Sequence, residues 1–91
     1  MDRIAFYDQL RAFLVAQNPD VDPGLVTGDA NLWDLGCVDS FGMVELILFL
    51  ETTLGAPIAI ERHSPRTFHT MARIYDAFVA PAPAAAAGGA A

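Results

Sequence analysis

The chain has 91 residues, a formal net charge of −6 and a single cysteine. This length suits one small domain, and one cysteine excludes an intramolecular disulfide. The acidity excludes the basic stripe that nucleic-acid binding requires and disfavours binding to an anionic membrane. No apolar run could span a bilayer, and residues 1–4 lack the features of a signal peptide, so we expect a cytoplasmic protein. No cluster of ligand residue types indicates a metal site.

The first predicted helix covers about residues 2–17. An apolar stripe at helical spacing predicts its core-facing side, with two further aromatic residues beside it: Ile4, Tyr7, Leu10 and Leu14, then Phe6 and Phe13. Asp2 provides a negative charge that favours the start of a helix. The pair Asn18-Pro19 predicts its end, because proline disfavours helical geometry in the residue before it.

A long connection, roughly residues 18–39, follows the first helix. Connections of this length inside a small domain are uncommon and often functional. It is rich in proline and glycine, so we expect at most a short helical turn within it. Five of its residues are predicted to pin it to the core: Leu25, Val26, Leu32, Trp33 and Leu35.

The second predicted helix covers about residues 40–54 and ends at Gly55, a favoured residue after a helix. It carries two apolar stripes. The first comprises Met43, Leu46, Ile47, Leu50 and Leu54, and the second comprises Phe41, Val44 and Leu48. A helix that is apolar nearly all round needs a second burial partner. Either the core wraps further round this helix, or the second partner is another protein.

The remaining residues predict one more main helix. Residues 57–60 read as extended or loop, and residues 61–64 as a short third helix. Thr67 is a suitable N-cap for the last helix. Its apolar residues recur at helical spacing: Phe68, Met71, Ile74, Tyr75 and Phe78. The sequence therefore predicts an all-α domain over residues 1–79, a bundle of three to four helices with a long first loop. Residues 80–91 form an Ala/Pro/Gly-rich tail that we expect to be disordered.

An Asp-Ser pair, Asp39-Ser40, stands where the long connection meets the second helix. One interpretation is purely structural: either residue is the N-cap that satisfies free backbone N–H groups. The other is functional. An exposed Ser40 hydroxyl would carry a phosphodiester close to the positive end of the helix dipole. Gly36 and Gly42 would then leave room for an approaching protein.

The same stretch offers that protein a binding strip. Phe41, Val44 and Leu48 would supply apolar contacts beside the serine. Glu45 and Glu51 would supply charges for basic partners. We expect these residues to lie on the surface.

This segment resembles the attachment site of phosphopantetheine-dependent carrier proteins, the acyl and peptidyl carrier family. The family motif is an Asp-Ser pair followed by a bulky apolar residue at the start of the second helix. The resemblance covers about residues 4–78 and includes the helix order, the long first loop and the helix start at Thr67. Many fatty-acid and polyketide carriers place one residue between the glycine and Asp-Ser, whereas Cys37 and Val38 make two here. The pattern Gly-x-x-Asp-Ser-bulky-Gly-x-Val is more similar to D-alanyl carriers and stand-alone aminoacyl carriers of nonribosomal peptide pathways.

The resemblance implies a role for each residue of the motif. Ser40 would carry a covalent 4′-phosphopantetheine arm, and Asp39 would help to position the magnesium ion of the transferase that attaches it. Partners would bind the face formed by Phe41, Val44, Glu45 and Leu48. The protein would be a monomer and not an enzyme, and it would hold its cargo as a thioester.

The implied partners are a phosphopantetheinyl transferase, an adenylating or acyl-loading enzyme, and a downstream acyltransferase, condensing or tailoring enzyme. The implied setting is a nonribosomal peptide, polyketide or related pathway. The cargo stays open among D-alanine, another amino acid, a β-amino acid and a short acyl chain.

Two other functions are weighed against this one. A non-catalytic interaction module would keep the same fold and use the second helix as its docking face. An enzyme would need a pocket with a paired acid and base or a nucleophile, and the sequence indicates neither. Cys37 has no neighbouring histidine to activate it, so we expect a free, partly buried thiol. We expect His63 and His69 to be surface residues and Trp33 to anchor the loop.

Overall fold

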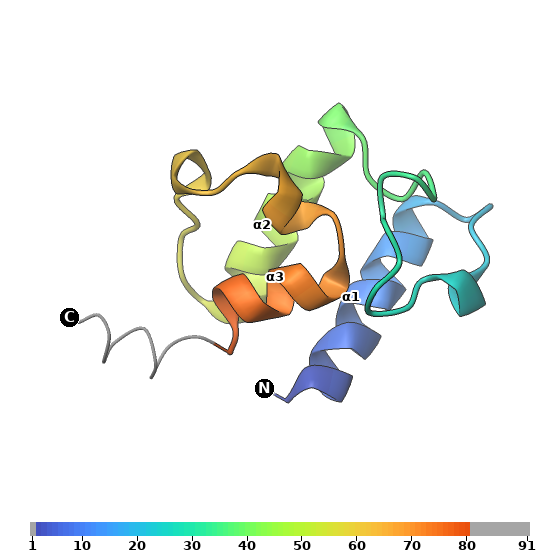
Figure 1. Cartoon of the computed structure of the whole chain (residues 1–91), viewed down its shortest axis with the longest axis horizontal. Coiled ribbons are helices and arrows are strands. Elements are labelled where there is room, and N and C mark those ends of the chain that lie inside the picture. Colours follow the sequence, from blue (N-terminus) through green and yellow to red (C-terminus); the bar gives the residue numbers. More distant parts are fainter. Residues whose placement is uncertain (1, 81–91) are drawn as a thin grey trace.

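A computed structural model of the chain describes residues 2–80. It contains three α-helices, α1 (Arg3–Gln17), α2 (Ser40–Leu54) and α3 (Met71–Phe78), and Figure 1 shows how they are arranged. Three single 3₁₀ turns lie in the connections: η1 (Pro23–Leu25), η2 (Ile60–Arg62) and η3 (Pro65–Phe68). No strand occurs within residues 2–80, which confirms a small all-helical bundle. None of the helices in this part of the chain has the length and apolar character needed to cross a membrane.

The first two helices begin and end where the sequence predicts. Asp2 is the N-cap of α1, and its Oδ1 accepts a hydrogen bond from the Ala5 amide at 2.8 Å. Gly55 follows α2 with a φ of 71°, a left-handed conformation that glycine adopts without a steric penalty. In the long connection between α1 and α2, η1 is the one short turn that the sequence predicts.

The core joins side chains from all three helices, from η3 and from the long connection. Its fully buried members are Phe6, Leu10, Leu14, Val26, Leu32, Leu46, Leu50, Phe68, Met71 and Ile74. Two predicted core residues are wrong: Ile4 is 68% exposed and Leu25 is 55% exposed. Ile4 lies two residues before Phe6, which at about 100° per residue places it on the opposite side of α1. Val26 takes the core position beside Leu25.

The last helix begins later than predicted, and Thr67 is not its N-cap. Thr70 is the cap, and its Oγ1 accepts a hydrogen bond from the Arg73 amide at 3.0 Å. Thr67 lies in η3. The buried Phe68 of η3 precedes Met71 by three residues, so its spacing in the sequence looks like that of a residue within the helix. The predicted helix at 61–64 is instead the single turn η2, three residues long. Of the predicted tail, residues 81–91 lie outside the described part.

Backbone hydrogen bonds hold the middle of the long connection. The Leu32 amide donates to the His69 carbonyl at 2.7 Å, and the Ala72 amide donates to the Gly28 carbonyl at 3.0 Å. These bonds join the connection to the start of α3. Figure 1 shows the connection passing beside α1 and reaching α2 at the top of the view. The start of α2 is therefore the end of a well-anchored segment.

Gly28→Ala is expected to destabilise the fold. A methyl group on Gly28 would lie 2.7 Å from Cε2 of Tyr7. That ring is held in place, because its hydroxyl accepts a hydrogen bond from Arg3 at 2.6 Å and it packs edge-on against Tyr75. Overpacking of this kind costs about 1–3 kcal/mol. Urea unfolding measures the loss.

Gly24→Ala is the matched control for this substitution. The nearest atom to a methyl group there is Asp22 Oδ1 at 3.3 Å, on an exposed side chain that can move. The free energy of unfolding should change little. Equal stability of the two variants would contradict the close packing of Gly28 on Tyr7.

Candidate functional site

Asp39 is the N-cap of α2. Its backbone is extended, and its Oδ1 accepts a hydrogen bond from the Gly42 amide at 2.6 Å. Its carbonyl accepts the first bond of the helix, from the Met43 amide at 2.8 Å. Of the two residues that were candidates for capping, Asp39 performs this role and Ser40 does not.

Ser40 is the first residue of α2, and it is exposed. Its hydroxyl makes no hydrogen bond to any residue of the described part. Because Asp39 satisfies the free amide of the first turn, the fold does not need this hydroxyl for capping. Among the described residues, no side chain forms a hydrogen bond with it that could activate it as a nucleophile.

Both glycines of the motif have roles within the chain. A methyl group on Gly42 would lie 3.2 Å from Asp39 Oδ1, so the glycine makes room for the cap. Gly36 has a φ of 80°, which L-residues with a side chain rarely adopt. Their residue type is therefore explained by the loop and the cap, while the predicted approach of another protein stays a prediction.

Asn18 fixes the segment just before Asp39, a role that the sequence did not indicate. Its Nδ2 donates to the Cys37 carbonyl at 2.8 Å and to the Leu14 carbonyl at 3.0 Å. The end of α1 is thereby tied to the residues just before Asp39. Cys37 and Val38 are both buried, so the chain reaches Asp39 from a fixed position in the core. In the sequence, Asn18 is recognisable only as the residue before Pro19 that ends the first helix.

The second apolar stripe of α2 is exposed. Phe41 is 76%, Val44 57% and Leu48 54% exposed. The interpretation that the core wraps round this side of α2 is therefore wrong for the described part of the chain. Glu45 is partly exposed on the same helix. We call Phe41, Val44, Glu45 and Leu48 the α2 strip.

Glu51 has a structural role within the chain. Its Oε2 accepts a hydrogen bond from the Ile58 amide at 2.8 Å, which fixes the connection after α2. The expectation that Glu51 also adds charge for basic partners stays a prediction. No sequence pattern indicated this bond, because the two residues lie on different elements.

A cleft of about 320 Å³ opens beside Ser40. It lies between the start of α2, the long connection and the segment from η2 to η3. Its lining comprises Trp33, Ser40, Met43, Ile60, His63, Pro65 and Phe68. We call it the Ser40 cleft.

The two histidines are only partly exposed. The His63 ring lies 4.7 Å from the ring of Phe78, and the His69 ring lies 6.1 Å from that of Trp33. The expectation of two surface histidines is therefore only partly right. Trp33 packs against the core and anchors the connection, as predicted.

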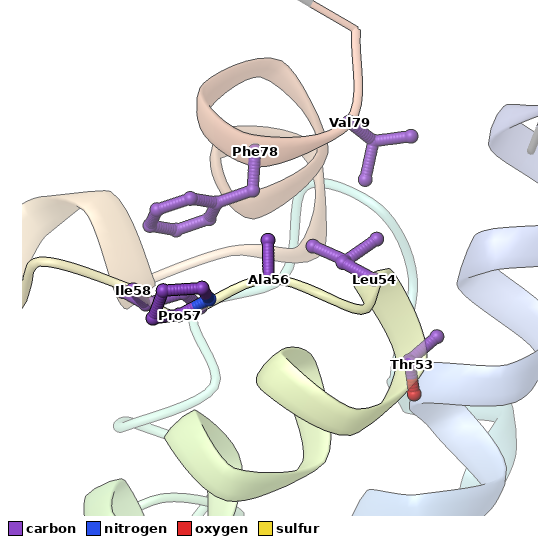
Figure 2. Close-up of a pocket in the computed structure, with 7 residues that line it drawn as sticks. All are labelled: Thr53, Leu54, Ala56, Pro57, Ile58, Phe78 and Val79. Carbon is purple, nitrogen blue, oxygen red and sulfur yellow. The ribbon is translucent and has the colours of Figure 1, made fainter.

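A second cleft, of about 450 Å³, lies at the far end of α2. Figure 2 shows Phe78 and Val79 on one side of it and Leu54, Ala56 and Pro57 on the other, with Thr53 and Ile58 completing the lining. None of these residues titrates near neutral pH or is a strong nucleophile. Within residues 2–80 no group of three or more His, Cys, Asp or Glu side chains is placed to hold a metal ion. We take the start of α2, where Asp39 and the exposed Ser40 lie, as the candidate functional site.

Cys37 is buried and free, and burial raises the pKa of its thiol above the ordinary value of 9.0. We expect slow labelling by a disulfide reagent at pH 7–8 in the folded protein and fast labelling in urea. The folded state holds this proton more tightly than the unfolded chain. Its contribution to stability is therefore complete below the unfolded pKa and is lost as pH rises through the folded pKa.

Unfolding measured at several alkaline pH values tests this linkage. Wild type should lose stability there more steeply than Cys37→Ala, which lacks the titrating group. Fast labelling of the folded protein at neutral pH, or identical alkaline slopes for both proteins, would contradict the buried thiol.

Comparison of the chain with protein-family profiles, with curated proteins and with solved structures finds no match. The resemblance to carrier proteins thus stays a prediction based on the motif.

Proposed function

We propose that this protein is a stand-alone acyl or aminoacyl carrier that holds its substrate as a thioester on a 4′-phosphopantetheine arm at Ser40. One observation carries the proposal. Asp39 caps α2 through Oδ1, and the exposed Ser40 hydroxyl next to it is left without a partner among the described residues.

The residues at the start of α2 fit the arm. A phosphodiester on Ser40 would lie at the N-terminal end of a 15-residue helix, where the helix dipole favours negative charge. Exposure of Ser40 lets the arm extend into solvent. Asp39 Oδ2 makes no hydrogen bond to a described residue, so it is free for the magnesium ion of a transferase.

Attachment of the arm is a phosphoryl transfer from coenzyme A. The Ser40 oxygen bonds to the phosphorus next to the pantetheine, and the bond from that phosphorus to the bridging oxygen of the pyrophosphate breaks. Adenosine 3′,5′-bisphosphate leaves, and the serine proton passes to a base on the transferase. The carrier supplies the hydroxyl, the Asp39 carboxylate as a ligand for the magnesium ion, and the surface that the transferase binds.

The α2 strip supports partner binding beside Ser40. Three exposed apolar side chains offer contact area, and Glu45 together with the net charge of −6 favours partners with basic surfaces. Tethering raises the effective concentration of the cargo at each enzyme, so weak binding is sufficient. We propose the transferase, a loading enzyme and an acyltransferase, condensing or tailoring enzyme as partners, in a nonribosomal peptide, polyketide or related pathway.

Incubation of the purified protein with coenzyme A, Mg²⁺ and several broad-range phosphopantetheinyl transferases tests the proposal. Intact mass spectrometry should show a gain of one arm per chain. A mass that stays unchanged with every transferase, while a known carrier is modified in parallel, would contradict the carrier function.

Asp39→Asn is expected to separate capping from arm attachment. Asparagine caps about as well as aspartate, so the free energy of unfolding should stay close to that of wild type. The rate of arm attachment should fall, because the amide is a poorer magnesium ligand. Asp39→Ala should lose both and cost about 1 kcal/mol of stability. If Asp39→Asn accepts the arm at the wild-type rate, the Asp39 carboxylate has no role in arm attachment.

The exposed strip also supports a second candidate, an interaction module that uses α2 as a docking face without any arm. In that case Ser40→Ala would leave partner binding intact, whereas Phe41→Asp or Leu48→Asp would abolish it. A carrier instead loses its function with either kind of substitution. Replacing the protein in its natural host by Ser40→Ala distinguishes the two: the module keeps its function, whereas the carrier loses it.

A further inference from the structure

Cys37, which lies shortly before Asp39, is held by both of its backbone polar groups. Its amide donates to the Leu32 carbonyl at 2.9 Å, and its carbonyl accepts a hydrogen bond from Asn18 Nδ2 at 2.8 Å. The side chains of Cys37 and Val38 are buried. The path of the chain into Asp39 is therefore set by two hydrogen bonds and two buried side chains.

The Asn18 side chain makes one of these two bonds from another helix. Asn18 closes α1, and its backbone amide and its Nδ2 both donate to the Leu14 carbonyl at 3.0 Å. The second hydrogen of Nδ2 is donated to Cys37, so both hydrogens of the amide are used. Among the described residues, no other side chain of α1 forms a hydrogen bond with residues 37–40.

Packing between α1 and α2 does not replace this bond. A cleft of about 190 Å³ lies between the end of α1 and the start of α2, and its lining includes Asn18 and Phe41. The aromatic stack that joins the two helices, Phe13 on Phe49 at 4.5 Å, lies further along α2. The Asn18 amide is thus the direct link from α1 to the segment that leads into Ser40.

Arm attachment is sensitive to where that segment lies. The Ser40 oxygen must approach the phosphorus while Asp39 reaches the magnesium ion, and a displacement of about 1 Å can cost roughly 100-fold in rate. Without the Asn18 amide, the Cys37 carbonyl would bond to water and residues 37–39 would occupy several positions. The α2 strip would still bind the transferase, but only part of the complexes would react. Loss of the amide should therefore lower kcat and leave KM unchanged.

Building on the carrier function proposed above, we propose that Asn18 is a positioning residue for arm attachment. By joining the end of α1 to the Cys37 carbonyl, it holds Asp39 and Ser40 where the transferase needs them. It touches neither coenzyme A nor the magnesium ion, and it acts through the segment between Cys37 and Ser40.

Steady-state kinetics of a transferase that modifies the wild type test this role, with coenzyme A saturating and the carrier varied. Asn18→Ala should lower kcat roughly threefold to tenfold, the equilibrium effect of losing one typical hydrogen bond. Asn18→Asp has the same shape but turns carboxylate oxygens toward two carbonyl oxygens, so its kcat should fall at least as far. KM should stay within twofold of wild type in Asn18→Ala. Urea unfolding gives the folded fraction of each variant, and the rates are corrected for it.

Arg11→Ala is the matched control. Arg11 Nε donates to the Val26 carbonyl at 2.8 Å, and its guanidinium also bonds to Asp8 at 3.0 Å. Like Asn18→Ala, this variant removes a bond from α1 to a carbonyl of the long connection and a second bond within α1. Because Val26 is remote in sequence from the motif, kcat should equal that of wild type.

Hydrogen exchange of the free protein provides a readout that needs no transferase. The Gly42 amide is bonded to Asp39 Oδ1, and the Cys37 amide to the Leu32 carbonyl. Both should exchange about threefold to tenfold faster in Asn18→Ala than in wild type. The Leu32 amide, bonded to the His69 carbonyl, should exchange at the wild-type rate.

Four results would overturn the inference: an unchanged kcat in Asn18→Ala, an equal fall of kcat in Arg11→Ala, a higher KM in place of a lower kcat, or a wild-type kcat in Asn18→Asp. In each of these cases the wild type accepts the arm, so the carrier function stands and only the positioning role fails. A wild type that no transferase modifies would instead contradict the carrier function, and hydrogen exchange would still report whether Asn18 holds the segment.

Discussion

Replacing Ser40 with alanine is expected to abolish arm attachment completely while leaving the fold intact. In the transfer, the hydroxyl oxygen forms the bond to phosphorus and its proton is lost, and alanine has no such group. No described residue depends on the hydroxyl for a hydrogen bond. Because Asp39 provides the cap, the free energy of unfolding should change by no more than about 0.5 kcal/mol, as for other surface substitutions. Intact mass after transferase treatment measures the first effect, and urea unfolding measures the second.

Ser64→Ala is the matched control, since Ser64 is the other serine of the chain. It is exposed and precedes η3 without a side-chain capping bond. This variant should accept one arm at the wild-type rate. Arm attachment to Ser40→Ala, or its loss in Ser64→Ala, would show that the site has been wrongly assigned.

Leu46→Ala is expected to reduce stability, and Leu48→Ala is expected to weaken partner binding, although the two residues lie only two positions apart on α2. Leu46 is fully buried, and truncating it removes core contacts and leaves a cavity. The expected loss is about 2–5 kcal/mol, a large part of the roughly 5–15 kcal/mol of a typical domain. Denaturant unfolding should show a much lower midpoint for this variant.

Leu48 is 54% exposed, so its truncation should change stability by no more than about 0.5 kcal/mol. Its effect should appear in partner binding, as a higher KM of the transferase for the carrier with the fold intact. Similar stability losses for the two variants would contradict the division of α2 into a core side and an exposed strip. If the KM of the transferase for Leu48→Ala equals that for wild type, Leu48 does not contribute to transferase binding.

Much of the fold follows from local signals. The start and end of α1 and α2 are fixed by Asp2, Asn18, Asp39 and Gly55, whose preferences act within a few residues. The two apolar stripes of α2 are visible in the sequence, but only the structure shows that the second stays uncovered. Burial depends on which elements pack together, and periodicity alone does not determine that.

The errors come from interactions between distant residues. The turn η3 and the cap at Thr70 depend on how Phe68 enters the core, so the choice between Thr67 and Thr70 is not a local one. The bond from Asn18 to the Cys37 carbonyl spans 19 residues. The Ser40 cleft is assembled from α2, the long connection and the segment from η2 to η3, none of which indicates a cavity by itself. The position of Ser40 at the exposed start of α2 was therefore predictable, whereas its surroundings were not.

The protein purified from its natural host offers the most direct measurement of the central claim. Intact mass spectrometry, followed by fragmentation of the peptide that contains residues 39–41, reports both the arm and its position. The carrier function predicts a chain heavier by one phosphopantetheine, alone or with cargo, and an attachment mapped to Ser40. An unmodified Ser40 in all of the isolated protein would contradict it.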